Sequence, residues 1–343
     1  MSTNFRIEEI QNSQIWEQFI SNQSFAVFVQ SPQYGEFYKT LKEDFFLLGI
    51  FEGEKIVGGS VVVTTHAKRG NFLYLPYGPI LPEAQKQESL TLFTQYLKAY
   101  AQKNDYSFIR VSPFLEETDA HKKLFKDCNY HAAPMHVLAE TTWILDIQPD
   151  EETLLKNMNK NHRNLIRRCE REGVSIKMTT IDADFTNLNK LLDITAERHK
   201  FIRFSEKYIA QEYKSFLPDH TAFFEAILPD GTVDGAAIIM FYGKMACYRH
   251  SASLGKNNKL PSSYLLQWRV IQEAKKRGMK LYNFWGIAPE NATPEHPFYG
   301  ITHFKKGFGG QVRNVLHCQD FVVSKKYYLN WIIETFRKKK RGF

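Results

Sequence analysis

The sequence predicts an α/β protein, with α+β character, in which one folding unit occurs twice. Three observations support this prediction. A β-hairpin, a helix and a buried strand follow one another in the same order in both halves of the chain. The second strand of each hairpin carries a step of small residues, and the interval from Gly59 to Pro113 equals the interval from Gly235 to Pro289. Matching elements at an equal offset indicate an internal duplication.

The first element of each copy is the hairpin. Residues 45–63 in the first half and 221–241 in the second contain two runs rich in β-branched and aromatic residues, separated by a short turn sequence with glycine. This composition is typical of a strand, a tight turn and a second strand. The small-residue steps are Gly58-Gly59-Ser60 and Gly235-Ala236-Ala237.

A helix and a further strand complete each copy. Residues 87–102 and 262–276 place their apolar side chains at helical spacing, and Gly278 follows the second helix where a C-terminal capping glycine is expected. Residues 108–113 and 281–287 are predicted to be the buried strands. Hairpin, helix and strand in this order resemble the core of the GNAT acyltransferases.

The fold class is therefore predicted to be a tandem duplication of GNAT-like domains with a cleft between them, a common place for ligands. We expect the first domain to comprise residues 1–146, with a return of about 316–343 onto it, and the second to comprise 147–315. The polar sequence 148–151 between them is a suitable linker and helix start.

Composition narrows the class of protein further. The 343 residues carry a net charge of +8, and the four cysteines are far apart in the sequence. Their spacing indicates reduced thiols, and the N-terminal residues lack the apolar block of a signal peptide. We therefore expect a cytoplasmic protein without a membrane span.

The positive charge is concentrated in two blocks. The segment from Lys156 to Arg171 contains six basic residues and a single acidic residue, Glu170. A second basic block comprises residues 337–341. Such blocks favour a polyanionic partner, although a solvated surface or a frayed tail would have the same composition. The second block could also contact anionic lipid at the inner face of the membrane.

Several common catalytic and cofactor-binding motifs are absent from the sequence. It lacks a Gly-x-Ser-x-Gly elbow, a phosphate loop, a dinucleotide-binding glycine pattern and a His-Glu-x-x-His helix. Neither half contains the Gln/Arg-x-x-Gly-x-Gly/Ala loop that holds coenzyme A in GNAT enzymes. We therefore predict no cofactor and no metal. His250 could be a functional or a structural histidine.

The stretch from Phe304 to Gly310, Phe-Lys-Lys-Gly-Phe-Gly-Gly, is the most distinctive local motif. Residues 311–315 after it are predicted to be extended, so it is not a phosphate loop. Its three glycines permit a close backbone approach, and a lysine beside such a turn can hold a phosphate or an oxyanion. The alternative is a plain β-turn with exposed lysines.

Five phrases together resemble the Fem family (FemABX) of peptidoglycan interpeptide-bridge aminoacyltransferases, and the resemblance covers nearly the whole chain. The phrases are residues 30–39, residues 72–80, the basic helix of residues 155–174, residues 195–208, and the motif from Phe304 to Gly310. The resemblance implies that an amine of a stem peptide attacks the ester of an aminoacyl-tRNA, with no covalent nucleophile. Orientation and oxyanion stabilisation would then supply the catalysis.

The resemblance also implies roles for individual residues. Lys305 would meet the oxyanion or the tRNA 3′ end, with Phe304 packed beside it. The peptidoglycan precursor would be held by Lys39, Arg203, Tyr208 and Tyr248. As alternatives, the two tyrosines could be packing residues and Lys39 a surface lysine. On the basic helix, Leu155, Met158, Leu165 and Cys169 would pack inward, leaving four cations for tRNA: Lys160, Arg163, Arg167 and Arg171.

Two departures from the family pattern affect the prediction. Only a short segment separates Phe185 from His220, so the long helical arm of many members is missing and the chain resembles the compact type. Ser112 and Phe114 flank Pro113 where members often carry an acidic residue, which leaves the general base unassigned. An acyl-CoA-dependent N-acyltransferase and a non-catalytic relative that binds RNA or membrane stay open as alternatives.

Overall fold

The computed structural model describes residues 5–67, 70–199, 202–255, 259–294, 296 and 298–341. The chain forms two compact units. Unit 1 comprises residues 1–23, 29–140 and 314–343, and unit 2 comprises residues 24–28 and 141–313. The short 3₁₀ helix η1 (Phe28–Gln30) lies at one of the points where the chain passes between the units.

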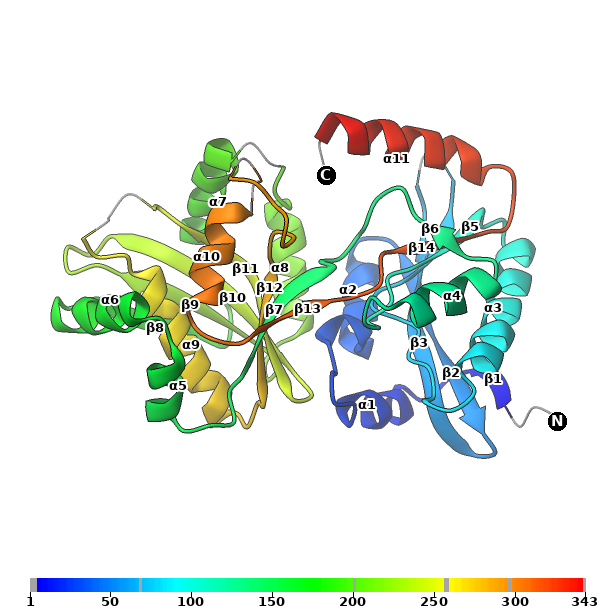
Figure 1. Ribbon diagram of the computed structural model, residues 1–343, viewed down its shortest axis with the longest axis horizontal. Helices are drawn as coiled ribbons and strands as arrows, with labels where there is room; N and C mark the ends of the chain where they lie inside the picture. Colours follow the sequence, from blue (N-terminus) through cyan, green and yellow to red (C-terminus); the bar gives the residue numbers. More distant parts are fainter. Residues whose placement is uncertain are drawn as a thin grey trace. The chain divides into compact units, whose positions relative to one another are not determined.

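Unit 1 is a mixed sheet with helices packed against it (Figure 1). Its strand order is β1-β2-β3-β4-β5-β14-β6. Its elements are β1 (Phe5–Glu9), α1 (Ser13–Ser21), α2 (Pro32–Thr40), β2 (Asp44–Glu52), β3 (Lys55–Thr65), β4 (Phe72–Leu75), α3 (Lys86–Lys103), β5 (Phe108–Val111), α4 (Asp119–Asp127), β6 (His131–Ala132), β14 (Gln319–Val322) and α11 (Tyr327–Arg341).

Unit 2 has a sheet of the same design, with the strand order β13-β7-β12-β11-β10-β9-β8. Its elements are β7 (Thr141–Asp146), α5 (Glu151–Asn157), α6 (Lys160–Arg171), β8 (Ser175–Thr179), α7 (Thr186–His199), α8 (Glu206–Ser215), β9 (Thr221–Ile227), β10 (Val233–Tyr242), β11 (Met245–Ser253), α9 (Ser263–Lys276), β12 (Leu281–Gly286), α10 (Tyr299–Lys306) and β13 (Gln311–Asn314).

The two sheets confirm the predicted duplication. The succession β2, β3, β4, α3, β5 in unit 1 corresponds to β9, β10, β11, α9, β12 in unit 2. In both units the hairpin is antiparallel, and the strand after it pairs in parallel with the strand that follows the helix. The predicted hairpins, helices and buried strands therefore all form.

Each sheet takes one strand from a distant part of the sequence. Strand β14 pairs with β5 in unit 1, and β7 takes the corresponding place beside β12 in unit 2. The expected domain boundary after Asp146 assigned β7 to the first domain, whereas its backbone pairs within the second sheet. Residues 24–28 also belong to unit 2, which the sequence did not indicate.

The predicted basic helix is interrupted. Helix α5 ends at Asn157, and α6 starts at Lys160 with the Asn159 side chain accepting a hydrogen bond from the Asn161 amide. This break rotates the apolar stripe, so that His162, Ile166 and Cys169 are the buried residues of α6, while Leu165 is only half-buried. The predicted stripe was therefore wrong at Leu165.

Each unit has its own hydrophobic core. In unit 1, α3 supplies Leu90, Phe93 and Leu97 to a cluster with β2, β4 and β5. In unit 2, α9 supplies Leu266, Val270 and Ile271 to a cluster with β9, β10 and β12. Within the described part of the chain, no helix combines the length and apolar character that a membrane crossing requires.

Candidate active site

The motif from Phe304 to Gly310 forms the end of helix α10 and the turn into strand β13. The extended structure predicted after it is confirmed, but the motif is not a plain β-turn. Gly309 and Gly310 have φ angles of 88° and 100°, which only glycine adopts readily. A Cβ at Gly310 would also collide with the carbonyl oxygen of Ile144 on β7. The glycines therefore allow the chain to turn against β7.

The two lysines of the motif have different surroundings. Lys306 is exposed, and its ammonium lies 5.4 Å from the centre of the Trp143 ring. Lys305 is only 5% exposed, and its Nζ donates a hydrogen bond to the carbonyl oxygen of Gly286 at 2.6 Å. Burial lowers the pKa of Lys305 to about 7. The Lys305 ammonium therefore loses its proton more readily than that of an exposed lysine.

The carbonyl that receives Lys305 lies at a strained point of β12. Trp285, directly before Gly286, has a φ of 65°, a conformation that costs energy for a bulky residue. The Asn283 side chain accepts a hydrogen bond from the Trp285 amide at 2.8 Å and supports this turn. Gly286 directly follows Trp285, so the contact with Lys305 lies beside the strained turn.

Phe304 joins the motif to the basic helix. Its carbonyl oxygen lies 2.9 Å from Nε2 of His162, near the start of α6. The rings of His162, Tyr264, Phe304 and Phe308 pack together with centroid separations between 4.7 and 6.2 Å. A Cβ at Gly307 would collide with the His162 ring. The structure therefore brings together two features that the sequence analysis treated separately.

Only three of the four predicted tRNA-binding cations lie on the surface. Lys160, Arg167 and Arg171 are exposed, and Arg171 pairs with Glu172 at 2.9 Å. The fourth, Arg163, is half-buried and donates through Nη1 to three carbonyl oxygens, those of Leu155, Lys156 and Met158. These carbonyls belong to the last turn of α5 and to its C-cap residue Met158, so Arg163 caps that helix.

Two predicted precursor-binding residues, Arg203 and Tyr208, lie around helix α8. Arg203 donates to Asp193 at 2.6 Å and to the Phe204 carbonyl at 3.0 Å. The Tyr208 ring stacks on Phe204 at a centroid distance of 4.4 Å. Tyr248, on β11, is half-buried against the core, and burial raises its pKa. These three residues belong to unit 2.

Lys39 belongs to unit 1, on α2. Its side chain is exposed, pairs with Glu36 at 3.1 Å, and lies 4.8 Å from the centre of the Phe45 ring. These contacts are those of a surface helix lysine. Because an exposed ion pair such as Lys39 and Glu36 is weak, the Lys39 ammonium can leave Glu36 for another anionic group.

Unit 2 also contains a buried ionic network that the sequence did not indicate. Glu212 on α8 is fully buried and accepts three hydrogen bonds from Arg249, of 2.9 to 3.1 Å, and it lies 2.5 Å from His250. Burial alone would raise the pKa of Glu212, but the charges and hydrogen bonds of Arg249 and His250 together outweigh burial and lower that pKa to about 2. His250 is thereby a buried, paired histidine.

Arg249 connects this network to the candidate site. It is the extra residue in a β-bulge, because Ile238 pairs with His250 and Ile239 pairs with Tyr248. Its Nη2 lies 3.4 Å from the Tyr208 hydroxyl. Its guanidinium also lies over three rings, those of Phe28, Phe204 and Trp285, at 5.4 to 5.7 Å. Through Trp285, Arg249 supports the turn that carries the Gly286 carbonyl.

The region around Pro113 supplies no clear proton acceptor. Ser112 is buried and its hydroxyl donates toward the Cys318 sulfur at 3.5 Å. Glu117 pairs with Lys122 at 3.0 Å on the surface. The candidate general base stays unassigned in this region.

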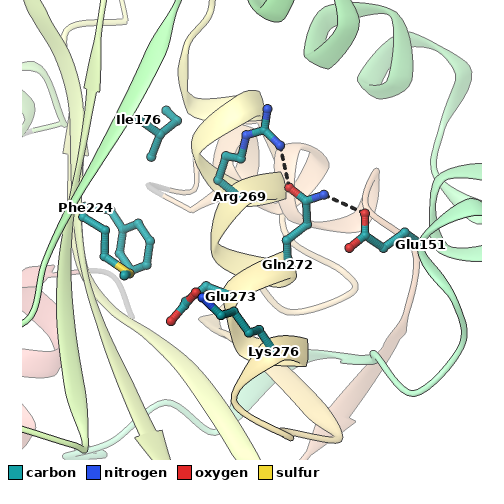
Figure 2. Close-up of a pocket in the computed structure, with 8 residues that line it drawn as sticks. Glu151, Ile176, Phe224, Arg269, Gln272, Glu273 and Lys276 are labelled. Carbon is teal, nitrogen blue, oxygen red and sulfur yellow. Dashed lines mark hydrogen bonds between the residues drawn. The ribbon is translucent and has the colours of Figure 1, made fainter.

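A pocket of about 370 Å³ lies between α9 and the strands β8 and β9 (Figure 2). Figure 2 shows Gln272 between Arg269 and Glu151, and it bonds to them at 2.8 and 2.6 Å. The pocket contains none of the predicted site residues. It is lined by Glu151, Ile176, Met178, Phe224, Arg269, Gln272, Glu273 and Lys276. Arg269, Gln272 and Glu151 bond to one another in this pocket, and Glu273 pairs with Arg277 at 2.9 Å.

Comparison with known proteins identifies related chains. The model of the FemAB family matches residues 12–132, 129–229 and 225–335. A "Lipid II:glycine glycyltransferase" of Staphylococcus saprophyticus subsp. saprophyticus is 26% identical over 170 residues, 50% of this chain and 37% of that protein. An "Aminoacyltransferase FemA" of Staphylococcus epidermidis is 23% identical over 258 residues, 74% of this chain and 53% of that protein.

The chain thus spans about half the length, or less, of the curated relatives it matches. Among solved structures, the crystal structure of FemX superposes with a TM-score of 0.82 at 15% identity, covering 95% of this chain and all of that one. This likeness shows a shared fold and confirms the predicted tandem acyltransferase-like architecture.

Proposed function

The chain belongs to the FemAB family, and from this premise we propose that it transfers an aminoacyl group to the stem-peptide amine of a peptidoglycan precursor. The donor in this proposal is an aminoacyl-tRNA. The acceptor is a muramyl pentapeptide, carried on a nucleotide or on a lipid. The name of one curated relative includes lipid II and supports the acceptor class, and the name of the other supports transfer of an aminoacyl group.

The reaction requires no covalent enzyme intermediate. The acceptor nitrogen attacks the ester carbon, a C–N bond forms, and the C–O bond to the tRNA ribose breaks. The nitrogen loses a proton, and the departing ribose oxygen gains one. Orientation of the two substrates can contribute roughly 7–11 kcal/mol, and one oxyanion donor about 3–4 kcal/mol. The enzyme must therefore supply a positioned donor and a path for one proton.

Lys305 is the observation that carries the proposal. It is a buried lysine whose contact at 2.6 Å is a backbone carbonyl, and its pKa is lowered to about 7. As an ammonium it can donate to the oxyanion, and as an amine it can accept the proton of the attacking nitrogen. A group with a pKa near the working pH suits proton transfer in both directions. Phe304 holds the helix end that presents it.

The exposed face of α6 supports an RNA donor. Lys160, Arg167 and Arg171 lie on the helix whose buried His162 contacts the Phe304 carbonyl. Phosphates bound along this face would hold an RNA on the helix that contacts the motif through His162. Contacts of this kind depend on charge, not on base sequence, and weaken with salt.

The rival donor is an acyl-CoA, on the same doubled fold. A transfer assay separates the two: the protein is incubated with muramyl pentapeptide and either a mixed pool of charged tRNAs or a set of acyl-CoAs, and the product mass is read. We expect an aminoacylated peptide from the tRNA pool only, and none after the RNA is deacylated. Product from acyl-CoA alone would overturn the proposed donor. No product from either donor would favour the non-catalytic alternative.

A further inference from the structure

Helix α11 has one face fixed on unit 1. Tyr327 and Asn330 are buried, and Glu334 accepts hydrogen bonds from two nitrogens of Arg110, at 3.0 and 2.8 Å. Arg110 lies on β5 and also pairs with the buried Asp320 of β14. The Tyr327 hydroxyl donates to Asp320 at 3.1 Å. This buried network sets the rotation of the helix about its axis.

The opposite face of α11 is apolar and uncovered. Leu329, Ile332 and Phe336 follow one another at spacings of three and four residues, so they form one stripe. They are 57%, 46% and 68% exposed. The neighbouring aromatic side chains of Tyr328 and Trp331 are exposed as well. A contiguous apolar patch of this kind on a fixed helix indicates an interaction site.

Basic residues flank the stripe at both ends. Lys325 and Lys326 precede the helix, and Arg337, Lys338 and Lys339 are exposed in its last turns. Lys326 pairs with the exposed Asp105. Between residues 325 and 339 the sole acid is Glu334, which the Arg110 contact occupies. The outer face of α11 therefore combines apolar and cationic groups, and of the described cations named here only Lys326 pairs with an exposed acid, Asp105.

We propose that α11 docks this face on the anionic surface of a lipid bilayer. Leu329, Ile332 and Phe336 would enter the boundary between headgroups and acyl chains, and the flanking cations would contact acidic headgroups. Tyr328 and Trp331 have the amphipathic rings that favour this boundary. Lysine and arginine near a bilayer add electrostatic attraction that salt weakens.

Other occupants fit this face less well. RNA would contact the cations but would give no role to a stripe of leucine, isoleucine and phenylalanine. A second copy of the chain could cover the stripe, but it would bring two groups of like charge together. The inference is independent of the proposed function, because docking requires neither the donor nor the acceptor.

Vesicle flotation of the full chain tests the inference. The vesicles contain phosphatidylcholine alone or with phosphatidylglycerol, and the compared variants are Leu329→Ser/Ile332→Ser/Phe336→Ser and Arg337→Gln/Lys338→Gln/Lys339→Gln. Ile181→Ser, at another exposed apolar position, is the matched control. We expect binding to the anionic vesicles, weakened by salt, and at least about tenfold weaker for both triple variants. The control should bind like the wild type.

Three results would overturn the inference: no wild-type binding to anionic vesicles, equal binding of the stripe variant, or a dimer in light scattering that the stripe variant abolishes. The single variant Phe336→Ser repeats the test with a smaller change, and circular dichroism confirms that the variants are folded. Because the assay contains no substrate, its failure leaves the transferase proposal untouched, and failure of the transfer assay leaves this one untouched.

Discussion

Lys305 donates a hydrogen bond from Nζ to the carbonyl oxygen of Gly286 at 2.6 Å, and this contact joins the end of α10 to the end of β12. Lys305 is buried, and this burial lowers its pKa to about 7. The Gly286 carbonyl follows Trp285, whose ring lies beside the Arg249 guanidinium. The reactive group that we propose is therefore coupled, through backbone and ring contacts, to the ionic network of Glu212.

The first prediction concerns the dependence of stability on pH. The pKa of Lys305 is about 7 in the folded protein and near 10.5 in the unfolded chain. Burial of this lysine therefore destabilises the fold fully below pH 7, and the penalty declines as pH rises from 7 to about 10.5. Relative to Lys305→Met, the free energy of unfolding of the wild type should rise over this window, by on the order of 3–5 kcal/mol. Urea denaturation at several pH values measures the difference, and a constant difference would contradict the assigned burial.

The second prediction concerns Glu212. Its removal leaves the Arg249 charge buried without a partner, so Glu212→Gln should cost about 3–5 kcal/mol in the free energy of unfolding. Glu206→Gln, at an exposed position of the same helix, should change the free energy of unfolding little. The pKa of Glu212 is about 2, below its ordinary value. Its contribution is thus complete above about pH 4.5 and is lost as pH falls towards 2. Equal stabilities of the two variants in urea would refute the prediction.

The third prediction concerns the glycines of the motif. Gly310→Ala would place a side chain at a φ of 100° and against the Ile144 carbonyl. Gly231 has a φ of 85° in open surroundings, so Gly231→Ala measures the backbone strain alone. We expect the free energy of unfolding to fall by about 1 kcal/mol in Gly231→Ala and by about 3 kcal/mol in Gly310→Ala. The midpoints of thermal and urea unfolding check this order, and similar losses would contradict it.

The fourth prediction concerns RNA binding by α6. The triple variant Lys160→Gln/Arg167→Gln/Arg171→Gln should bind charged tRNA more weakly, and the slope of log K against log salt should fall by roughly 0.7–0.9 for each cation removed. Arg163→Gln should instead lower stability and leave that slope unchanged, because Arg163 caps α5. Filter binding over a range of salt concentrations distinguishes the two. An unchanged slope in the triple variant would remove α6 from the proposed donor site.

Most of the fold could be predicted because it depends on local patterns. Alternating and helical apolar spacing, and turn glycines such as Gly278, are visible in one segment at a time. A return of about 316–343 to the first domain was expected, but the pairing of β14 with β5 and of β7 with β12 could not be predicted in this way, because strand pairing over a long sequence distance has no local signature. The break at Asn159 was visible in principle, since asparagine is a common N-cap. An uninterrupted helical spacing nevertheless favoured one continuous helix.

In the candidate site too, the features with a local sequence pattern could be predicted, and those that depend on tertiary packing could not. The motif with Lys305 could be found from its glycines and from the family resemblance. The burial of Lys305 and its lowered pKa follow from tertiary packing, which no spacing reveals. Arg249 and Glu212 lie on different elements, β11 and α8, so the sequence shows two ordinary charged residues. Two features of the sequence could have indicated this network. Glu212 lies one helical turn after Tyr208, and Arg249 directly follows Tyr248.

Single-turnover transfer from charged tRNA to muramyl pentapeptide tests the central claim most directly, with Lys305→Met compared against Lys306→Met. The two lysines are adjacent, but one is buried and the other exposed. We expect Lys305→Met to slow transfer by about 10²–10³-fold, the usual effect of losing one oxyanion donor, and Lys306→Met to stay within a few-fold of the wild type. A folded Lys305→Met protein that transfers at the wild-type rate would contradict the account.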